Sequence, residues 1–168
     1  MKSSETTNKQ PTVAIGQPIS LQDVYAVATG AAHVSLSDGG LAKMARARGV
    51  IERLLDGDAP PTYGVNTGFG ALAETRVATE DLAELQHRLV RSHAVGVGAL
   101  LGVRETRAMM LLRAHVLALG YSGTRPIVAT TLIEFLNRGI HPCIPSQGSV
   151  GASGDLAPLA HLALALIG

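Results

Sequence analysis

The sequence predicts a mainly α-helical protein. Of its 168 residues, 46% are hydrophobic but only 3% are aromatic, so we expect a core of Leu, Ala, Val and Ile side chains. Apolar residues recur at helical spacing along most of the chain, and glycine or proline interrupts each run. We therefore expect an α-rich N-terminal part with short strands, which leads into the start of a long-helix bundle.

Five helices and one strand are expected before the last glycine-rich stretch. Ser20 can cap a first helix that ends at Gly30, and an alternating pattern predicts a brief strand over 31–36. The other four helices are expected to run from Ser37 or Asp38 to Leu55, from Thr79 or Glu80 through His93, from Arg104 to Leu119 and from Pro126 to Asn137. Residues 141–147 contain two prolines and are expected to form an irregular connection.

The final helix is expected over residues 156–167, which are almost all Leu and Ala. His161 is the one clearly polar residue in this run. A helix that is apolar on every face needs partners on every side. We therefore expect this chain to be the front part of a longer protein, or to depend on partner chains.

Three segments are expected along the chain. Residues 1–16 are predicted to be a disordered tail, 17–103 an N-terminal domain, and 104–168 the start of a central helical bundle. The net charge is +1 and no Lys/Arg cluster forms, so a nucleic-acid partner is not expected. The longest apolar run is shorter than the about 20 residues of a membrane-spanning helix, so no membrane partner is expected either.

The location and metal content can also be predicted. The N-terminus has no apolar stretch typical of a secretory signal, and the one cysteine, Cys143, points weakly to a reducing compartment. A cytoplasmic protein is therefore expected. The histidines are not spaced like metal ligands, so no metal site is expected.

Two glycine-rich stretches interrupt the helical pattern. Residues 62–70 read TYGVNTGFG and carry Tyr63 and Phe69, two of the five aromatic residues, so we expect a mobile functional loop. Residues 148–155 read GSVGASGD and precede the last helix, where the positive end of the helix dipole suits an electron-poor group. Neither stretch matches a P-loop, a dinucleotide fingerprint or a nucleophile elbow.

The second stretch and its continuation, GSVGASGDLAPLA, resemble the signature of the aromatic amino acid ammonia-lyases. In that family the Ala-Ser-Gly tripeptide cyclises and loses water, which gives methylidene-imidazolone (MIO), an electrophile made from the chain itself. The resemblance implies that Ala152, Ser153 and Gly154 form this group autocatalytically and that no external cofactor is needed. The residue types fit the chemistry, because the Gly154 nitrogen must reach the Ala152 carbonyl carbon and a glycine approaches with little hindrance. Ser153 supplies the hydroxyl that is lost.

The first stretch is similar to the family's mobile loop. That similarity implies that Tyr63 is the catalytic base and that Asn66 and Gly70 bind substrate. Ser92 and His93 follow Tyr63 by 29 and 30 residues, as the family's substrate-selecting pair does. A Ser-His pair resembles that of the histidine ammonia-lyases. The implied reaction is the elimination of ammonia from L-histidine to give trans-urocanate, a step of histidine degradation.

The resemblance covers roughly residues 17–168 and also implies what the chain lacks. The family's further active-site groups lie on later helices, and its sites are built from more than one subunit of a homotetramer. We therefore expect a truncated member of the fold that is inactive alone. Two alternatives stay open: a lyase or aminomutase for another aromatic amino acid, and a non-catalytic truncated or split subunit that docks onto partner chains.

Overall fold

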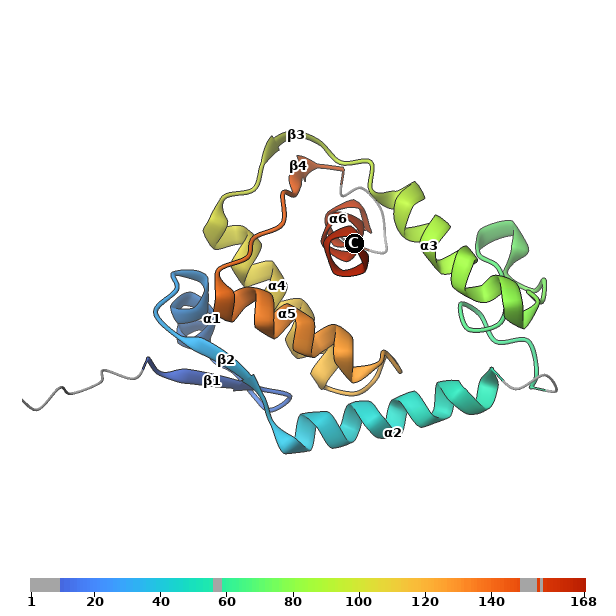
Figure 1. Cartoon of the computed structure of the whole chain (residues 1–168), viewed down its shortest axis with the longest axis horizontal. Coiled ribbons are helices and arrows are strands. Elements are labelled where there is room, and N and C mark those ends of the chain that lie inside the picture. Colours follow the sequence, from blue (N-terminus) through green and yellow to red (C-terminus); the bar gives the residue numbers. More distant parts are fainter. Residues whose placement is uncertain (1–9, 56–58, 149–153, 155) are drawn as a thin grey trace, which may run out of the picture.

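A computed structural model describes residues 10–55, 59–148, 154 and 156–168 (Figure 1). Six α-helices and four short strands lie within these residues, which confirms the mainly helical prediction. In chain order the elements are β1 (Thr12–Ile15), α1 (Leu21–Ala28), β2 (His33–Leu36), α2 (Asp38–Leu54), α3 (Leu82–His93), β3 (Val97–Leu100), α4 (Val103–Ala118), α5 (Pro126–Arg138), β4 (Pro145–Gln147) and α6 (Leu156–Ile167). Short 3₁₀ helices occupy Gly70–Leu72 and Thr79–Asp81.

The N-terminal unit is a parallel strand pair, β1 and β2, joined through α1. The helix begins as predicted at Ser20, whose Oγ accepts a hydrogen bond from the backbone nitrogen of Asp23 at 3.2 Å. The Asp23 carboxylate accepts in return from the backbone nitrogen of Ser20 at 2.8 Å. This reciprocal capping box satisfies two donors that the helix itself leaves unpaired.

The predicted disordered tail over residues 1–16 is wrong for its last part, because Thr12–Ile15 forms β1. Residues 1–9 lie outside the described residues. Within β1, Val13 and Ile15 are buried, and each pairs with a residue of β2 21 positions further along the chain. A four-residue strand that depends on such distant pairing leaves little local pattern to read.

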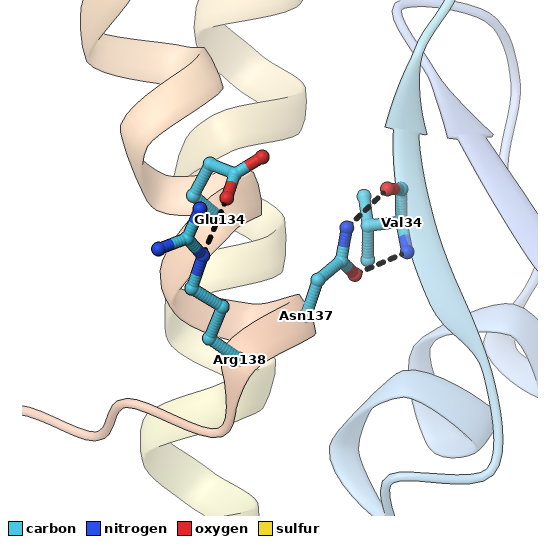
Figure 2. A network of polar contacts seen from close by, with 4 residues as sticks. All are labelled: Val34, Glu134, Asn137 and Arg138. Atoms are coloured by element: carbon cyan, nitrogen blue, oxygen red, sulfur yellow. Dashed lines mark hydrogen bonds and ion pairs between the residues drawn. The ribbon is translucent and has the colours of Figure 1, made fainter.

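The side-chain amide of Asn137 on α5 forms two hydrogen bonds with the backbone of β2, and we call this pair of bonds the Asn137 rung (Figure 2). Its Oδ1 accepts from the backbone nitrogen of Val34 at 2.8 Å, and its Nδ2 donates to the carbonyl oxygen of the same residue at 2.9 Å. Val34 is 3% exposed, so these backbone groups have little access to water. The side-chain amide therefore satisfies two buried polar groups that would otherwise be costly to leave unpaired.

A second correction concerns residues 141–147, which were expected to be an irregular connection. β3 and β4 pair as a short antiparallel ladder, with Val97 opposite Gln147 and Leu100 opposite Pro145. The backbone nitrogen of Leu101 extends the contact by donating to the carbonyl oxygen of Ile144 at 2.8 Å. The ladder is irregular between its two pairs, which is why glycine and proline could be accommodated in it.

One aliphatic core joins the strands of the N-terminal unit to α4, α5 and α6. Its fully buried members include Ile15, Met110, Leu132 and Ile144. The expected division between residues 103 and 104 stays a prediction, although the core contains residues from both sides of it. In Figure 1, α6 is seen end-on between α3 and α5, with which it is in contact.

The last helix is only partly covered in this chain. Ala157, Pro158, Ala160 and Leu162 are buried, whereas Leu156 at one end and Ile167 at the other are 48% and 44% exposed. The described helices therefore do not surround an element whose composition calls for burial on every side. No helix in the described part of the chain combines the length and apolar character that crossing a membrane requires.

Arg107 on α4 is a buried cation that joins four parts of the fold. Its Nε donates to the carbonyl oxygen of Val27 at 2.7 Å, and its Nη1 donates to the carbonyl oxygen of Leu136 at 2.9 Å. Those carbonyls lie in the last turns of α1 and α5, where the helix dipoles are negative. The same Nη1 donates to Nε2 of His141 at 3.2 Å, which requires a neutral imidazole. Burial lowers the pKa of Arg107 below its usual value.

The Asn137 rung gives a direct stability prediction. We expect Asn137→Ala to lower the free energy of unfolding by about 1–3 kcal/mol, because it leaves two buried backbone groups unpaired. Glu134→Ala on the same helix is the matched control. It removes an exposed ion pair to Arg138, which should contribute at most about 0.5 kcal/mol. Urea unfolding of both variants measures the difference, and equal losses would contradict a structural role of the rung.

His141 gives a pH prediction. Burial, and secondarily the charge of Arg107, hold the pKa of His141 below its ordinary value of 6.5. As the pH falls, the unfolded chain therefore binds more protons than the folded chain. The contribution of neutral His141 to the free energy of unfolding is complete above pH 6.5 and is lost below it. We expect His141→Gln, which keeps an acceptor but does not titrate, to lose less stability than the wild type on acidification. The measurement is the urea midpoint at about pH 7 and about pH 5.

The control for this experiment is His33→Gln, at an exposed position on β2. Burial lowers the pKa of His115 too, and this second group remains in both variants, so a part of the acid sensitivity should persist. A wild-type pH dependence in His141→Gln, matching that of His33→Gln, would show that His141 does not contribute.

Candidate active site

Tyr63 projects from a tight turn. The backbone nitrogens of Val65 and Asn66 both donate to the carbonyl oxygen of Thr62, at 3.0 and 3.2 Å, which places Tyr63 and Gly64 at the tip. Gly64 has φ +72°, a left-handed conformation that favours glycine. The Tyr63 ring is 64% exposed and meets Phe69 edge-on, with 5.7 Å between ring centroids and 78° between planes. The phenol is thus supported on one side and open to an incoming molecule.

Asn66 anchors this turn. Its side chain is 3% exposed, and its Oδ1 accepts from the backbone nitrogen of Thr62 at 2.6 Å. Its Nδ2 donates to the carbonyl oxygens of Leu54 and Pro60, both at 3.1 Å. Because these bonds use both amide hydrogens, the side chain ties the turn to the end of α2. A contact between Asn66 and substrate stays a prediction, and in this structure both amide hydrogens of the side chain already bind the carbonyl oxygens of the anchor.

The chain after Asn66 is held as well. The backbone nitrogen of Gly68 donates to the carbonyl oxygen of Thr75 at 3.1 Å, and that of Val77 donates to the carbonyl oxygen of Asn66 at 3.0 Å. Gly70, the other loop residue predicted to bind substrate, is exposed, has φ +58° and begins a 3₁₀ turn. The Tyr63 turn therefore lies between anchored segments of the loop.

Ser92 and His93 end α3. His93 Nδ1 lies 2.8 Å from the carbonyl oxygen of Leu89, and Ser92 Oγ donates to that same oxygen at 2.9 Å. A carbonyl can only accept, so we assign the proton of the neutral imidazole to Nδ1. Nε2 then holds a lone pair and can accept a hydrogen bond. His93 is half-buried and Ser92 exposed, so the pair combines a fixed ring with an accessible hydroxyl.

Of the predicted electrophile, the structure describes only Gly154; Ala152 and Ser153 lie outside the described residues, as does Asp155. Gly154 has φ +84°, and among the described residues no atom lies within 4 Å of the position that a Cβ would take. Its carbonyl oxygen accepts from the backbone nitrogen of Leu156 at 2.9 Å, at the start of α6. An unhindered left-handed glycine directly before a helix fits the residue whose nitrogen must attack a neighbouring carbonyl.

Ser92 and His93 lie together, and Tyr63 lies against Phe69, but no hydrogen bond joins the Tyr63 turn to the Ser92–His93 pair within the described residues. An open hollow of about 690 Å³ lies between α2, α3 and the turn after α4. Gly64 and Val65 line it, whereas none of the predicted site residues that the structure describes does. Nor do three His, Cys, Asp or Glu side chains come together anywhere in the described ranges as a metal site would need.

His161 has a specific partner that the sequence did not reveal. Its Nε2 accepts a hydrogen bond from the backbone nitrogen of Gly96 at 3.0 Å. The ring is half-buried. Gly96 is the one available signal in the sequence for this contact, since a residue without a side chain allows another group to approach its backbone closely.

Comparisons with known proteins agree on one group. The aromatic amino acid lyase family matches residues 19–168. The chain is 54% identical over 154 residues to the histidine ammonia-lyase of Anaeromyxobacter dehalogenans, which covers 91% of this chain and 30% of that protein. Among solved structures it resembles tyrosine aminomutase from Streptomyces globisporus, with a TM-score of 0.84 and 39% identity over 94% of this chain and 29% of the other.

A second solved structure is histidine ammonia-lyase from Trypanosoma cruzi, with a TM-score of 0.81 and 36% identity over 94% of this chain and 30% of the other. The chain therefore spans about 30% of the length of the curated relatives it matches.

The Asn66 anchor can be tested by substitution. We expect Asn66→Ala to lower the free energy of unfolding by about 1–3 kcal/mol, because the half-buried backbone nitrogen of Thr62 and the carbonyl oxygens of Leu54 and Pro60 each lose a hydrogen bond. We also expect limited proteolysis to cut the chain faster near Tyr63. Thr75→Ala, an exposed position in the same loop region, is the control and should change neither measurement. Cleavage at the wild-type rate in Asn66→Ala would show that other contacts hold the turn.

Proposed function

This chain belongs to the aromatic amino acid lyase family, and on that premise we propose that it supplies the front part of an enzyme that eliminates ammonia from L-histidine to give trans-urocanate. The observation that carries the choice of histidine is the 54% identity to a histidine ammonia-lyase over a segment that contains the Ser92–His93 pair. Relatives of this kind are carbon–nitrogen lyases, and the reaction adds no water and transfers no electrons to an outside acceptor.

The Ala152-Ser153-Gly154 tripeptide is the proposed source of the MIO group, with no external cofactor. The open, left-handed backbone of Gly154 supports this role. Once formed, this group supplies an electrophilic carbon that makes the substrate amine a better leaving group. The start of α6 at Leu156, two residues after Gly154, supports the same role, because the positive end of a helix dipole stabilises nearby negative charge.

Tyr63 is the proposed general base that removes a proton from the substrate carbon next to the one bearing nitrogen. Its exposed ring, fixed edge-on by Phe69, leaves the phenol oxygen free to approach a bound molecule. A base must come within hydrogen-bond reach of the proton it removes, and a turn anchored by Asn66 limits where Tyr63 can go.

The Ser92–His93 pair is the proposed reader of the substrate side chain. His93 Nε2 can accept from the N–H of an imidazole, and the Ser92 hydroxyl offers a second polar group beside it. A polar pair matches a polar ring, because a phenyl group could not donate a hydrogen bond to the lone pair on His93 Nε2.

The remaining parts of the enzyme are proposed from the relatives' greater length. A complete site would need groups outside this chain, and we propose a cytoplasmic homotetramer in which further segments cover α6. The main alternative is a lyase or aminomutase acting on another aromatic amino acid, which the likeness to tyrosine aminomutase favours. A non-catalytic subunit that docks onto partner chains is the other alternative, which the exposed ends of α6 favour.

The test combines mass and activity. The chain is co-expressed with the part of the Anaeromyxobacter dehalogenans enzyme that follows the matched segment, and its intact mass is measured. We expect the loss of two waters, formation of urocanate from histidine, and no activity from the 168-residue chain alone. Ser153→Ala has no side-chain hydroxyl to eliminate, so we expect this variant to show neither the loss of two waters nor the formation of urocanate.

The base is tested in the same complemented protein. We expect Tyr63→Phe to slow urocanate formation by about 10²- to 10⁴-fold, the usual contribution of a general base. Tyr121→Phe is the matched control, since that ring is 91% exposed and lies far along the chain. Full activity in Tyr63→Phe would exclude it as the base. A β-amino acid as the product would favour the aminomutase alternative. A complex that assembles while this chain keeps its unmodified mass would favour the non-catalytic docking subunit.

A further inference from the structure

His161 links two segments that are far apart in the sequence. Its Nε2 accepts from the backbone nitrogen of Gly96 at 3.0 Å, across 65 residues. In the neutral ring the proton must then lie on Nδ1. His161 is on α6, the helix that follows the tripeptide, whereas Gly96 comes three residues after His93 at the end of α3.

Close packing surrounds this bond. A Cβ on Gly96 would lie 3.1 Å from His161 Nε2 and 3.1 Å from the Cβ of Pro145. A Cβ on Gly148 would lie 3.0 Å from the Cα of Gly96 and 3.1 Å from the Cβ of Ala157. All four distances are tighter than ordinary van der Waals contact, so the two glycine backbones lie directly against each other and against α6. We call Gly96, Gly148, Ala157 and His161 the glycine clasp.

The glycine clasp holds three parts of the proposed site at one point. Ala157 and His161 are four residues apart and therefore on one face of α6. Ala157 is the second residue of α6, and Gly148 is the last described residue before the segment that carries Ala152 and Ser153. Gly148 thus lies against both Gly96, which follows the Ser92–His93 pair, and Ala157 near the start of α6.

We propose that His161 is a positioning residue: through the Gly96 hydrogen bond it fixes the end of α3, with Ser92 and His93, relative to the helix that starts directly after the tripeptide. The role in substrate selection rests on the proposed function, but the positioning itself does not. Packing of α3 on α6 alone would fix the distance between the helices. The hydrogen bond adds a direction, because it requires the Gly96 N–H to face one ring atom.

The experiment compares His161→Ala with His161→Gln in the 168-residue chain. The Gln side chain offers a polar acceptor near the position of Nε2, whereas Ala offers none. The readouts are the hydrogen-exchange rate of the Gly96 amide and the imidazole NMR signals of His93. We expect His161→Ala to speed exchange at Gly96 by about threefold to tenfold, the fold-change that loss of one hydrogen bond corresponds to. The His93 signals should shift, and His161→Gln should restore both readouts.

Two control variants separate positioning from general loosening. Ile133→Val removes one buried methyl group from α5 and should lower the melting temperature without changing Gly96 exchange selectively. His33→Gln, at an exposed site, should change nothing. The proposal is overturned if His161→Ala leaves Gly96 exchange and the His93 signals unchanged, if Gln fails to restore them, or if Ile133→Val produces the same local pattern.

These readouts need no substrate and no formed MIO group. Failure of the complemented protein to make urocanate would therefore overturn the proposed function and leave the positioning result standing. Unchanged exchange at Gly96 would overturn the positioning by His161 whatever the activity of the complemented protein.

Discussion

The fold depends on the burial of one guanidinium group. Arg107 has no carboxylate partner in the part of the chain that the structure describes, and placing a cation away from water is costly. Carbonyl oxygens at the ends of α1 and α5 offset that cost, since each lies at the negative end of a helix dipole. The consequence is geometric: α1, α4, α5 and the segment leading to β4 must all meet at one side chain. Because His141 precedes β4 by four residues, the same side chain anchors the segment that leads into the β3–β4 ladder.

Helices could be predicted from the sequence because their causes are local. The Ser20 capping box, the helical spacing of apolar residues and the glycine after α5 each lie within a few residues of what they determine. The short strands could not be predicted in the same way. β1 needs a partner 21 residues away, and β3 needs one that lies beyond two intervening helices. Their stability comes from pairing that no local pattern records.

The candidate site shows the same division. Tyr63 and the Ser92–His93 pair could be nominated because their motifs resemble those of the ammonia-lyase family. What the sequence could not show is the partner of each polar group. Asn66 in a glycine-rich loop looks available for a ligand, yet its amide hydrogens bind the carbonyls of Leu54 and Pro60. His161 in an apolar helix looks inert, yet it binds a backbone nitrogen 65 residues away.

The pairing of Asn137 with Val34 has a consequence for how the family's sequences can vary. One amide that bonds both backbone groups of a single residue fixes the rotation of α5 about its own axis as well as its distance from the sheet. Each inserted or deleted residue in a helix turns everything beyond it by roughly 100°. A change of length within α5 would therefore aim Asn137 away from β2. Length variation should be tolerated in the loops on either side of α5 and excluded from the helix.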